Sequence, residues 1–406
     1  MLMYERLARE LTGVKEFALP YWDWTQDRQL PPAFLDQAWP GKPGKQNPLY
    51  ESSRTMDPTD SLPDEIVGHD VITKIMGQSD FELFGTSRPQ GQDSLDQAWI
   101  ANPSGTQSTL EFTPHNNVHG WVGGLMGGFR SAFDPIFMMH HCNIDRIWAQ
   151  WRALPGNLDS SDPLWLGMTF QGHFFNPDGS SYSPKVSDLL IPETLGYSYG
   201  IPGPQVATGP NVLSLNSKVN TLFLKSGASA AVGVQTFRAE NAQPARATQP
   251  LEVPVKVTPA LISAVAKRPS LGAGAELLDF RAVREVAASQ PRALAFIRDI
   301  AASSDSNTQF RVFLNCDYLS QQTPISRNEY VATFGFFGNG EHAGHGGAKP
   351  SIVVDLTSTI ARVFGAAPVT LDTLRVQILP VPRGKASVEQ TGTAIPARVE
   401  IAFIPV

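Results

Sequence analysis

The stretch TLEFTPHNNVHGWVGGLMGGFRSAFDPIFMMHHCNIDRIWAQW, residues 109–151, contains four of the eight histidines of the 406-residue chain. His115 and His119 are four residues apart, so on a helix their imidazoles lie on one face, one turn from each other. His140 and His141 begin a second helical stretch with apolar residues at helical spacing. Because adjacent helix residues point about 100° apart, we expect only one of this second pair to complete a metal site. The stretch therefore predicts a helical core that carries three metal-binding histidines.

The donor set indicates which metal this site binds. Imidazole nitrogen suits copper or zinc, and a set without cysteine or carboxylate fits copper that cycles with oxygen. A zinc hydrolase of the HExxH type would place a glutamate inside the motif, whereas Asn116, Asn117 and Val118 stand there. A single HxxxH pair is commonly a surface feature of an amphipathic helix. Four histidines within 27 residues favour a metal site instead.

Length, charge and cysteine content limit the class of protein. A chain of 406 residues predicts two domains, or one large and one smaller domain. The formal net charge of -6 offers no basic surface for a phosphate backbone, which argues against nucleic acid as a partner. No apolar run approaches the length of a membrane helix, so we expect no membrane partner. Two cysteines, Cys142 and Cys316, indicate neither a disulfide framework nor a compartment, and nothing indicates an oligomeric state.

Composition changes along the chain and predicts its organisation. Residues 1–205 combine helical patterns, at 1–12 and 140–153, with long loops rich in proline, glycine and asparagine. Residues 206–258 are poor in aromatic residues and marked by proline and glycine, so we interpret them as a linker. Residues 259–406 contain alternating, β-branched runs separated by turn residues. We therefore predict a mainly α-helical domain with long loops, a linker and a carboxy-terminal β-sandwich.

Taken together, these motifs resemble the second copper-binding motif of the type-3 copper proteins, which are tyrosinases, catechol oxidases and haemocyanins of the molluscan type. The residues that carry the resemblance are HNNVH at 115–119, WVGG at 121–124, DPIFMMHHCNIDR at 134–146 and LPYWDW at 19–24. The resemblance covers most of residues 1–151. It implies an oxidoreductase that uses copper and dioxygen to oxidise phenols to catechols and catechols to quinones.

The resemblance also implies roles for individual residues. The copper ligands would be His115, His119 and His141, with His140 as a neighbour outside the ligand set. Glu111 and Asn116 would hold a water that helps to deprotonate a phenol. Phe129, in the loop before the third ligand, would be the residue that gates access to the copper.

One part of the family pattern is missing. Members of the family hold two coppers, and the histidines of the first lie upstream of a helix that resembles residues 2–10, LMYERLARE. Only second-site ligands are thus present, and His69 lies in the wrong place to replace the others. We expect either a start codon assigned too late or a truncated chain, with negligible oxidase activity for the chain as written. Two alternatives stay open: a haemocyanin-like oxygen carrier, and a single-metal relic without oxidase activity.

The carboxy-terminal region resembles the β-sandwich that follows the copper domain in haemocyanins, plant polyphenol oxidases and some bacterial tyrosinases. FRVFLN at 310–315 and YVATFGFFGNG at 330–340 carry this weaker resemblance. It implies a domain that covers the copper site and places a bulky side chain in it. Phe336 and Phe337 are the candidates for that side chain.

Overall fold

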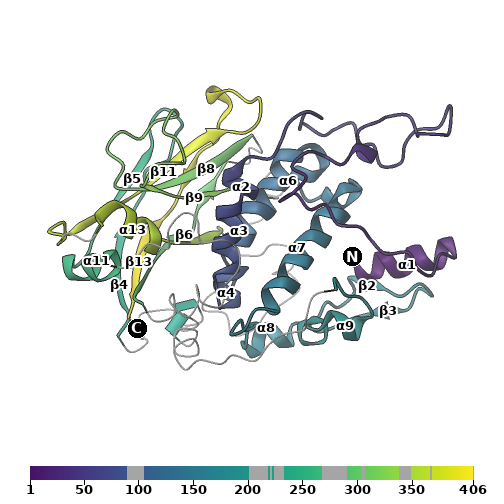
Figure 1. Cartoon of the computed structure of the whole chain (residues 1–406), viewed down its shortest axis with the longest axis horizontal. Helices are drawn as coiled ribbons and strands as arrows, with labels where there is room; N and C mark the ends of the chain where they lie inside the picture. Colours follow the sequence, from purple (N-terminus) through teal and green to yellow (C-terminus); the bar gives the residue numbers. More distant parts are fainter. Residues whose placement is uncertain are drawn as a thin grey trace.

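The computed structural model describes residues 1–88, 105–200, 218–219, 222–223, 233–267, 290–303, 307–337, 349–365 and 368–405. Figure 1 shows a helical part on one side and a part built of β-sheets on the other, with α2 and α6 lying next to β8 and β9. A mainly α-helical region with long loops is thus followed by a β-sandwich, which confirms the predicted fold class. Within the described ranges, no helix has the length and apolar character needed to cross a bilayer.

The helical part consists of short helices joined by long loops. Its α-helices are α1 (Leu2–Thr12), α2 (Asp64–Val67), α3 (His69–Met76), α4 (Phe81–Phe84), α6 (Asn116–Val122), α7 (Ile136–Arg152), α8 (Pro163–Gly167) and α9 (Pro192–Leu195). Single turns lie at η1 (Pro32–Phe34), η2 (Glu111–His115), η3 (Gly124–Gly127), η4 (Ser131–Phe133) and η5 (Val186–Leu189), and a small hairpin pairs β2 (Phe174–Phe175) with β3 (Ser181–Tyr182). Helices α1 and α7 confirm the two predicted helical patterns.

The start of α7 depends on Asp134. This buried carboxylate accepts the backbone N–H of Ile136 at 3.0 Å and pairs with Arg54 at 2.7 Å. Trp151, in the last turn of α7, is fully buried and donates its indole N–H to the carbonyl of Gln78. Both ends of the helix are therefore tied to distant loops, which holds its histidines in place.

Two sheets form the sandwich. The five-stranded sheet has the order β1-β10-β6-β13-β4, and the four-stranded sheet has the order β5-β11-β8-β9. The strands are β1 (Thr106–Gln107), β4 (Gln235–Glu240), β5 (Leu251–Lys256), β6 (Arg292–Arg298), β8 (Thr308–Leu314), β9 (Tyr330–Phe334), β10 (Ser351–Asp355), β11 (Thr373–Pro382) and β13 (Arg398–Ile404). Strands β7 (Ala301–Ala302) and β12 (Ala394–Ile395) form a separate pair, and α11 (Pro259–Ala266), α13 (Thr357–Phe364) and η7 (Val388–Gln390) complete the part.

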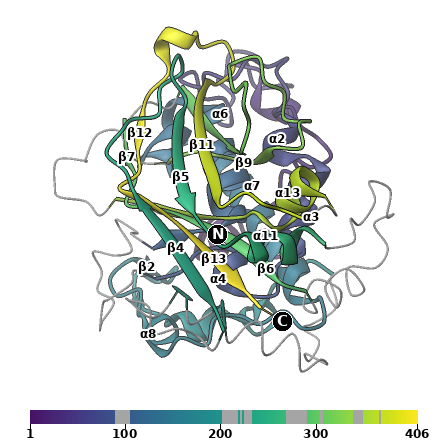
Figure 2. The same cartoon turned by 90° about the vertical axis from the view of Figure 1, so that its left-hand side faces the viewer.

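The two sheets share one apolar core. Their inward side chains form a single buried cluster that includes Val253, Ala295, Val312 and Ile401. Figure 2 looks onto the sandwich, with β4, β5, β11 and β13 in front and α6 and α7 behind them. Strand β1 comes from the amino-terminal half yet pairs in parallel with β10 (Thr106 with Ser351), so the two parts are also joined through a sheet.

The linker predicted at 206–258 is wrong where β4 and β5 lie. In β5, every second residue is buried, beginning with Leu251, and the residues that alternate with these are exposed. This is the period of a strand that has one face on a core. Pro254 hid this pattern, but β5 is an edge strand, where a missing N–H is tolerated. Much of 206–232 lies outside the described residues. The rest of the division, 1–205 and 259–406, stays a prediction.

Candidate metal centre

Two adjoining helical segments and α7 bring the four histidines together. His115 ends the π-helical turn η2, which contains Pro114, and His119 follows one turn later in α6. π-helical turns recur at functional sites because they shift the direction of side chains relative to a regular helix. His140 and His141 come from the second turn of α7. The predicted pairing of an HxxxH helix with a second histidine-bearing helix is thus present in the fold.

The imidazole nitrogens converge on one point. One ring nitrogen from each of His115, His119, His140 and His141 lies within 4.8 Å of the other three. The Nε2 atoms of His119 and His141 are 3.0 Å apart. Two nitrogens bound to one metal at about 2.0 Å each would have a similar separation. This group could therefore hold a metal ion.

Hydrogen bonds to Nδ1 define the orientation of two of the rings. Nδ1 of His115 lies 3.2 Å from both Oε1 of Glu111 and Oδ1 of Asn116, and Nδ1 of His119 lies 2.8 Å from the carbonyl oxygen of Met126. Because these partners can only accept, both Nδ1 atoms carry a proton. The lone pair of each neutral ring is then on Nε2, which is the atom free to bind a metal.

His140 has the opposite arrangement. The indole N–H of Trp24 donates to its Nδ1 at 3.2 Å, and both side chains are fully buried. Its ring is nearly parallel to that of His115, with centroids 5.6 Å apart. Trp24 belongs to the LPYWDW string, so that string contacts the histidine group through this hydrogen bond.

Burial and neighbouring charge control the protonation of the group. Burial, reinforced by the neighbouring histidines, holds the pKa of His119, His140 and His141 well below the usual range. Burial would also lower the pKa of His115, but the charge of Glu111 and the hydrogen bonds from Glu111 and Asn116 raise it. Neutral imidazoles are the form that binds metals, so most of the group is ready for a metal near neutral pH.

Glu111 is the anionic partner of this group. Burial would raise the pKa of Glu111, but the charge and hydrogen bond of His115 lower it. Its carboxylate lies 3.2 Å from Nδ1 of His115, and its side chain as a whole is 31% exposed. Asn116 is almost fully buried, and its amide donates to Gln107 and to the carbonyl of Gly335.

Two phenylalanine rings pack against the histidines. The ring of Phe337 lies 4.1 Å from that of His119, and the ring of Phe137 lies 4.1 Å from that of His141. Phe337 follows β9, so one of the two candidates from the sequence, Phe336 and Phe337, lies on the sandwich side of the histidines. Phe129 is 61% exposed between η3 and η4, and its gate role stays a prediction. The sequence did not single out Phe137, although its position four residues before His141 could have done so.

The sandwich is joined to the metal-bearing turn through backbone and side-chain contacts. Gly335 donates its N–H to the carbonyl of Phe112 at 2.9 Å, and the hydroxyl of Thr113 donates to the carbonyl of Thr333 at 2.9 Å. A β-carbon at Gly335 would lie only 2.5 Å from the side-chain oxygen of Asn117, so glycine is required for this close approach. These contacts place Phe337 at the histidines.

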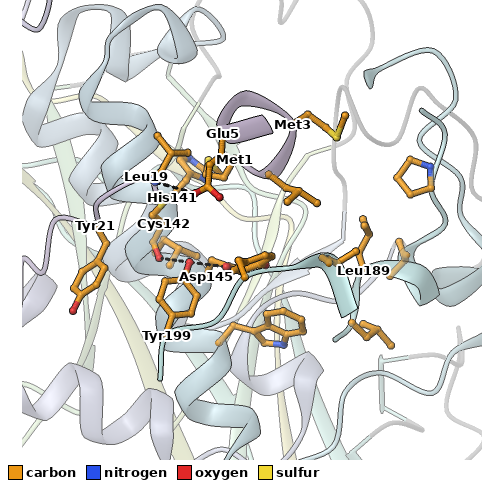
Figure 3. Close-up of a pocket in the computed structure, with 18 of the residues that line it drawn as sticks. Met1, Met3, Glu5, Leu19, Tyr21, His141, Cys142, Asp145, Leu189 and Tyr199 are labelled. Atoms are coloured by element: carbon orange, nitrogen blue, oxygen red, sulfur yellow. Dashed lines mark hydrogen bonds between the residues drawn. The ribbon is translucent and has the colours of Figure 1, made fainter. Parts of the chain in front are cut away.

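A cavity of about 1110 Å³ lies beside the group, next to α1 and α7. Figure 3 shows His141, Cys142 and Asp145 of α7 on its wall, with Tyr199 donating to Asp145 at 2.7 Å. Glu111 also lines it, and most of the wall is apolar. Among the described residues of this wall, His141 is the only histidine. The cavity therefore gives a small molecule a route to one face of the group.

The remaining histidines lie elsewhere. His69 begins α3, where it is exposed, and its Nε2 lies 3.4 Å from the hydroxyl of Thr73. His69 and His173 are not part of the four-histidine group, the single such group that the described ranges contain. His342 and His345 lie outside those ranges.

Comparison with known proteins shows which proteins this chain resembles. The family described as the common central domain of tyrosinase matches residues 1–154. Polyphenol oxidase E of Solanum lycopersicum and catechol oxidase B of Solanum tuberosum, both chloroplastic, are each 30% identical over 249 residues, which cover 54% of this chain and 40% of those proteins. The chain thus spans about two fifths of the length of these relatives.

A solved structure shares the whole fold. Recombinantly expressed latent aurone synthase (polyphenol oxidase) matches 100% of this chain and 74% of its own chain, with a TM-score of 0.61 and 20% identity. At this identity the match shows the fold alone, a helical region followed by a sheet-rich one. Residues 1–154 thus match the central domain of tyrosinase, and the two relatives to which the chain is similar are a polyphenol oxidase and a catechol oxidase.

Proposed function

We propose that His115, His119 and His141 bind one copper of a centre that oxidises phenols and catechols to quinones with dioxygen, as tyrosinases and catechol oxidases do. The observation that carries this proposal is the convergence of four histidine ring nitrogens within 4.8 Å of one another, three of them from buried residues. The donor set is all imidazole, without cysteine or carboxylate, which suits copper. Copper would supply the chemistry with dioxygen, and the protein would supply geometry, access and a base.

The hydrogen bonds of the rings support this ligand set. His115 and His119 have their Nδ1 protons directed at acceptors, which leaves Nε2 for the metal. Nε2 of His141 lies 3.0 Å from that of His119, as expected for two ligands of one ion. Three protein ligands would leave a coordination position for an exogenous molecule.

Glu111 is the candidate base for a phenol. Its carboxylate touches His115 and lines the cavity that also reaches His141. A phenol in that cavity could therefore pass its hydroxyl proton to Glu111. Asn116 is a candidate for orienting His115 and not for a proton transfer. Its buried amide faces Nδ1 of His115 with the oxygen and donates from the nitrogen to Gln107 and Gly335. Phe129 remains the proposed gate.

The route of access favours an enzyme over an oxygen carrier of the haemocyanin kind. The sandwich covers one side of the group with Phe337, which we propose acts as a lid. On the other side, the cavity leaves His141 and Glu111 within reach of a small molecule. A carrier that excludes phenols would need both sides closed.

A single-metal function is the second candidate. Only one group with metal-ligand geometry is found among the residues that the structure describes. Oxidation of phenols in this family needs a second copper, so we expect the 406-residue chain by itself to bind one copper and to show negligible oxidase activity.

Copper content and quinone formation together test the proposal. Both are measured on the 406-residue chain and on a version extended upstream in the same reading frame. Two coppers per chain with catechol oxidation in the extended version would support the oxidase. One copper in both versions, without oxidation, would contradict the oxidase and leave the single-metal candidate. No copper in either version would contradict both.

A further inference from the structure

Trp24 and His140 form a buried pair whose function the proposed ligand set does not explain. Both side chains have no exposed surface, and the indole Nε1–H of Trp24 donates to Nδ1 of His140 at 3.2 Å. His140 is also one of the four residues whose ring nitrogens lie within 4.8 Å of one another. A fourth imidazole is thus close enough to compete for the metal.

The direction of this hydrogen bond decides the tautomer of His140. An indole N–H can only donate, so Nδ1 of His140 must present its lone pair to it. A neutral imidazole has one proton, which is then on Nε2. Neither nitrogen of His140 has a lone pair left for a metal, because one accepts from Trp24 and the other carries hydrogen.

His115 and His119 have the opposite tautomer. Their Nδ1 atoms face the acceptors Glu111 and Asn116 in one case and the carbonyl of Met126 in the other. Each ring therefore turns an unprotonated Nε2 toward the centre of the group. The difference between these rings and His140 lies in the partner of Nδ1, and for His140 that partner is Trp24.

We propose that Trp24 is a positioning residue which, through its hydrogen bond, keeps His140 out of the metal's ligand set. The inference rests on the proposed copper site. Four imidazoles around one ion would close it, whereas three leave a position for an exogenous ligand, as catalytic metal sites require. Trp24 therefore sets the number of protein ligands, although it touches neither metal nor substrate.

The tautomers can be measured without a metal. The metal-free full chain is labelled with ¹⁵N-histidine, and long-range ¹H–¹⁵N correlations report which ring nitrogen carries the proton; His140→Gln identifies the signals of residue 140. We expect the Nε2–H form at His140 and the Nδ1–H form at His119. A His140 ring with its proton on Nδ1, or on both nitrogens, would overturn the proposal.

The ligand number is then counted on the copper-loaded protein by pulsed EPR, which detects coordinated nitrogens. We expect three nitrogens in the wild type and a fourth in Trp24→Phe, and the fourth should disappear in the double variant Trp24→Phe with His140→Gln. Trp22→Phe is the matched control, because Trp22 is also buried but donates to the carbonyl of Asp27 at 2.7 Å. It should keep three nitrogens.

These outcomes separate the inference from the function on which it rests. A chain that binds no copper but shows the expected tautomers would contradict the copper site and leave the role of Trp24 in the metal-free protein intact. Three nitrogens in Trp24→Phe, or a fourth in Trp22→Phe, would overturn the role of Trp24 while the copper site stands.

Discussion

Glu65 is expected to hold the sandwich against the helical part. It lies in α2 and is 6% exposed, and its two oxygens accept four hydrogen bonds from the four-stranded sheet. Arg311 donates twice, at 2.7 and 2.8 Å, Gln309 donates at 2.8 Å and Thr333 donates at 2.9 Å. Glu65→Ala would leave these donors without their acceptor at the boundary between the two parts.

The loss of stability caused by Glu65→Ala follows from the burial of the ion pair with Arg311. Removing one partner of a buried ion pair costs about 3–5 kcal/mol, because the other charge stays in a poorly solvated place. The side chain of Arg311 is 20% exposed, so water can offset part of this cost. We therefore expect a loss of about 3 kcal/mol in the free energy of unfolding, at the lower end of that range.

Asp64→Ala is the matched control. Asp64 is the neighbouring residue, and its side chain is 72% exposed where it pairs with Arg28. An exposed pair of this kind contributes about 0–1 kcal/mol. Urea unfolding of the metal-free chain gives the free energies, and amide exchange at Gly335, which bonds to Phe112, reports on the contact between the two parts.

If the free energy needed to separate the two parts falls by about 3 kcal/mol in Glu65→Ala, amide exchange at Gly335 should become faster by about two orders of magnitude. Equal stability of Glu65→Ala and Asp64→Ala, with unchanged exchange at Gly335, would refute the reasoning.

Three further predictions concern the site and its surroundings. Phe337→Ala should speed copper uptake, because it uncovers His119, with rates followed by stopped flow; unchanged rates would argue against a lid. Glu111→Ala should weaken copper binding about 10-fold or more by freeing the Nδ1 side of His115, measured by competition with a chelator, whereas Glu111→Gln keeps an acceptor and should lose less. Burial and the charge of Glu82 raise the pKa of Asp80 to about 8, so the folded protein retains a proton that the unfolded chain releases near pH 4. Stability due to this group falls as pH rises from about 4 to 8, and the advantage of Asp80→Asn over the wild type in urea unfolding should grow by more than about 1 kcal/mol between pH 5 and pH 8; an equal advantage at both pH values would contradict this.

The sequence predicted the strands in which apolar and β-branched residues follow a clear pattern. The run FRVFLN at 310–315 lies in β8 apart from its last residue, and the run YVATFGFFGNG at 330–340 begins with β9. Strand β5 escaped because Pro254 interrupts its pattern, and proline marks a linker unless the strand is known to lie at an edge. Whether a strand lies at the edge depends on how the whole sheet is assembled, and the residues of that strand alone do not determine this.

For the site, spacing and resemblance identified the histidines but not their hydrogen-bond partners. The partners of His119 and His140 are the carbonyl of Met126 and the indole of Trp24, the latter 116 residues away from His140. A backbone carbonyl has no sequence signature, and contact across that separation is fixed by packing. Phe337 was one of two candidates for the covering side chain, since alternation along β9 does not say which ring points at the metal-bearing turn.

Copper binding by ligand variants tests the proposed site most directly. The 406-residue chain is loaded with copper, weakly bound metal is removed with a chelator, and copper per chain is measured for the wild type and for His119→Ala, His140→Ala and His173→Ala. We predict one copper in the wild type, its loss in His119→Ala, and its retention in His140→Ala and in the control His173→Ala, which lies outside the group. Retention of copper in His119→Ala, or its loss in His173→Ala, would contradict the site.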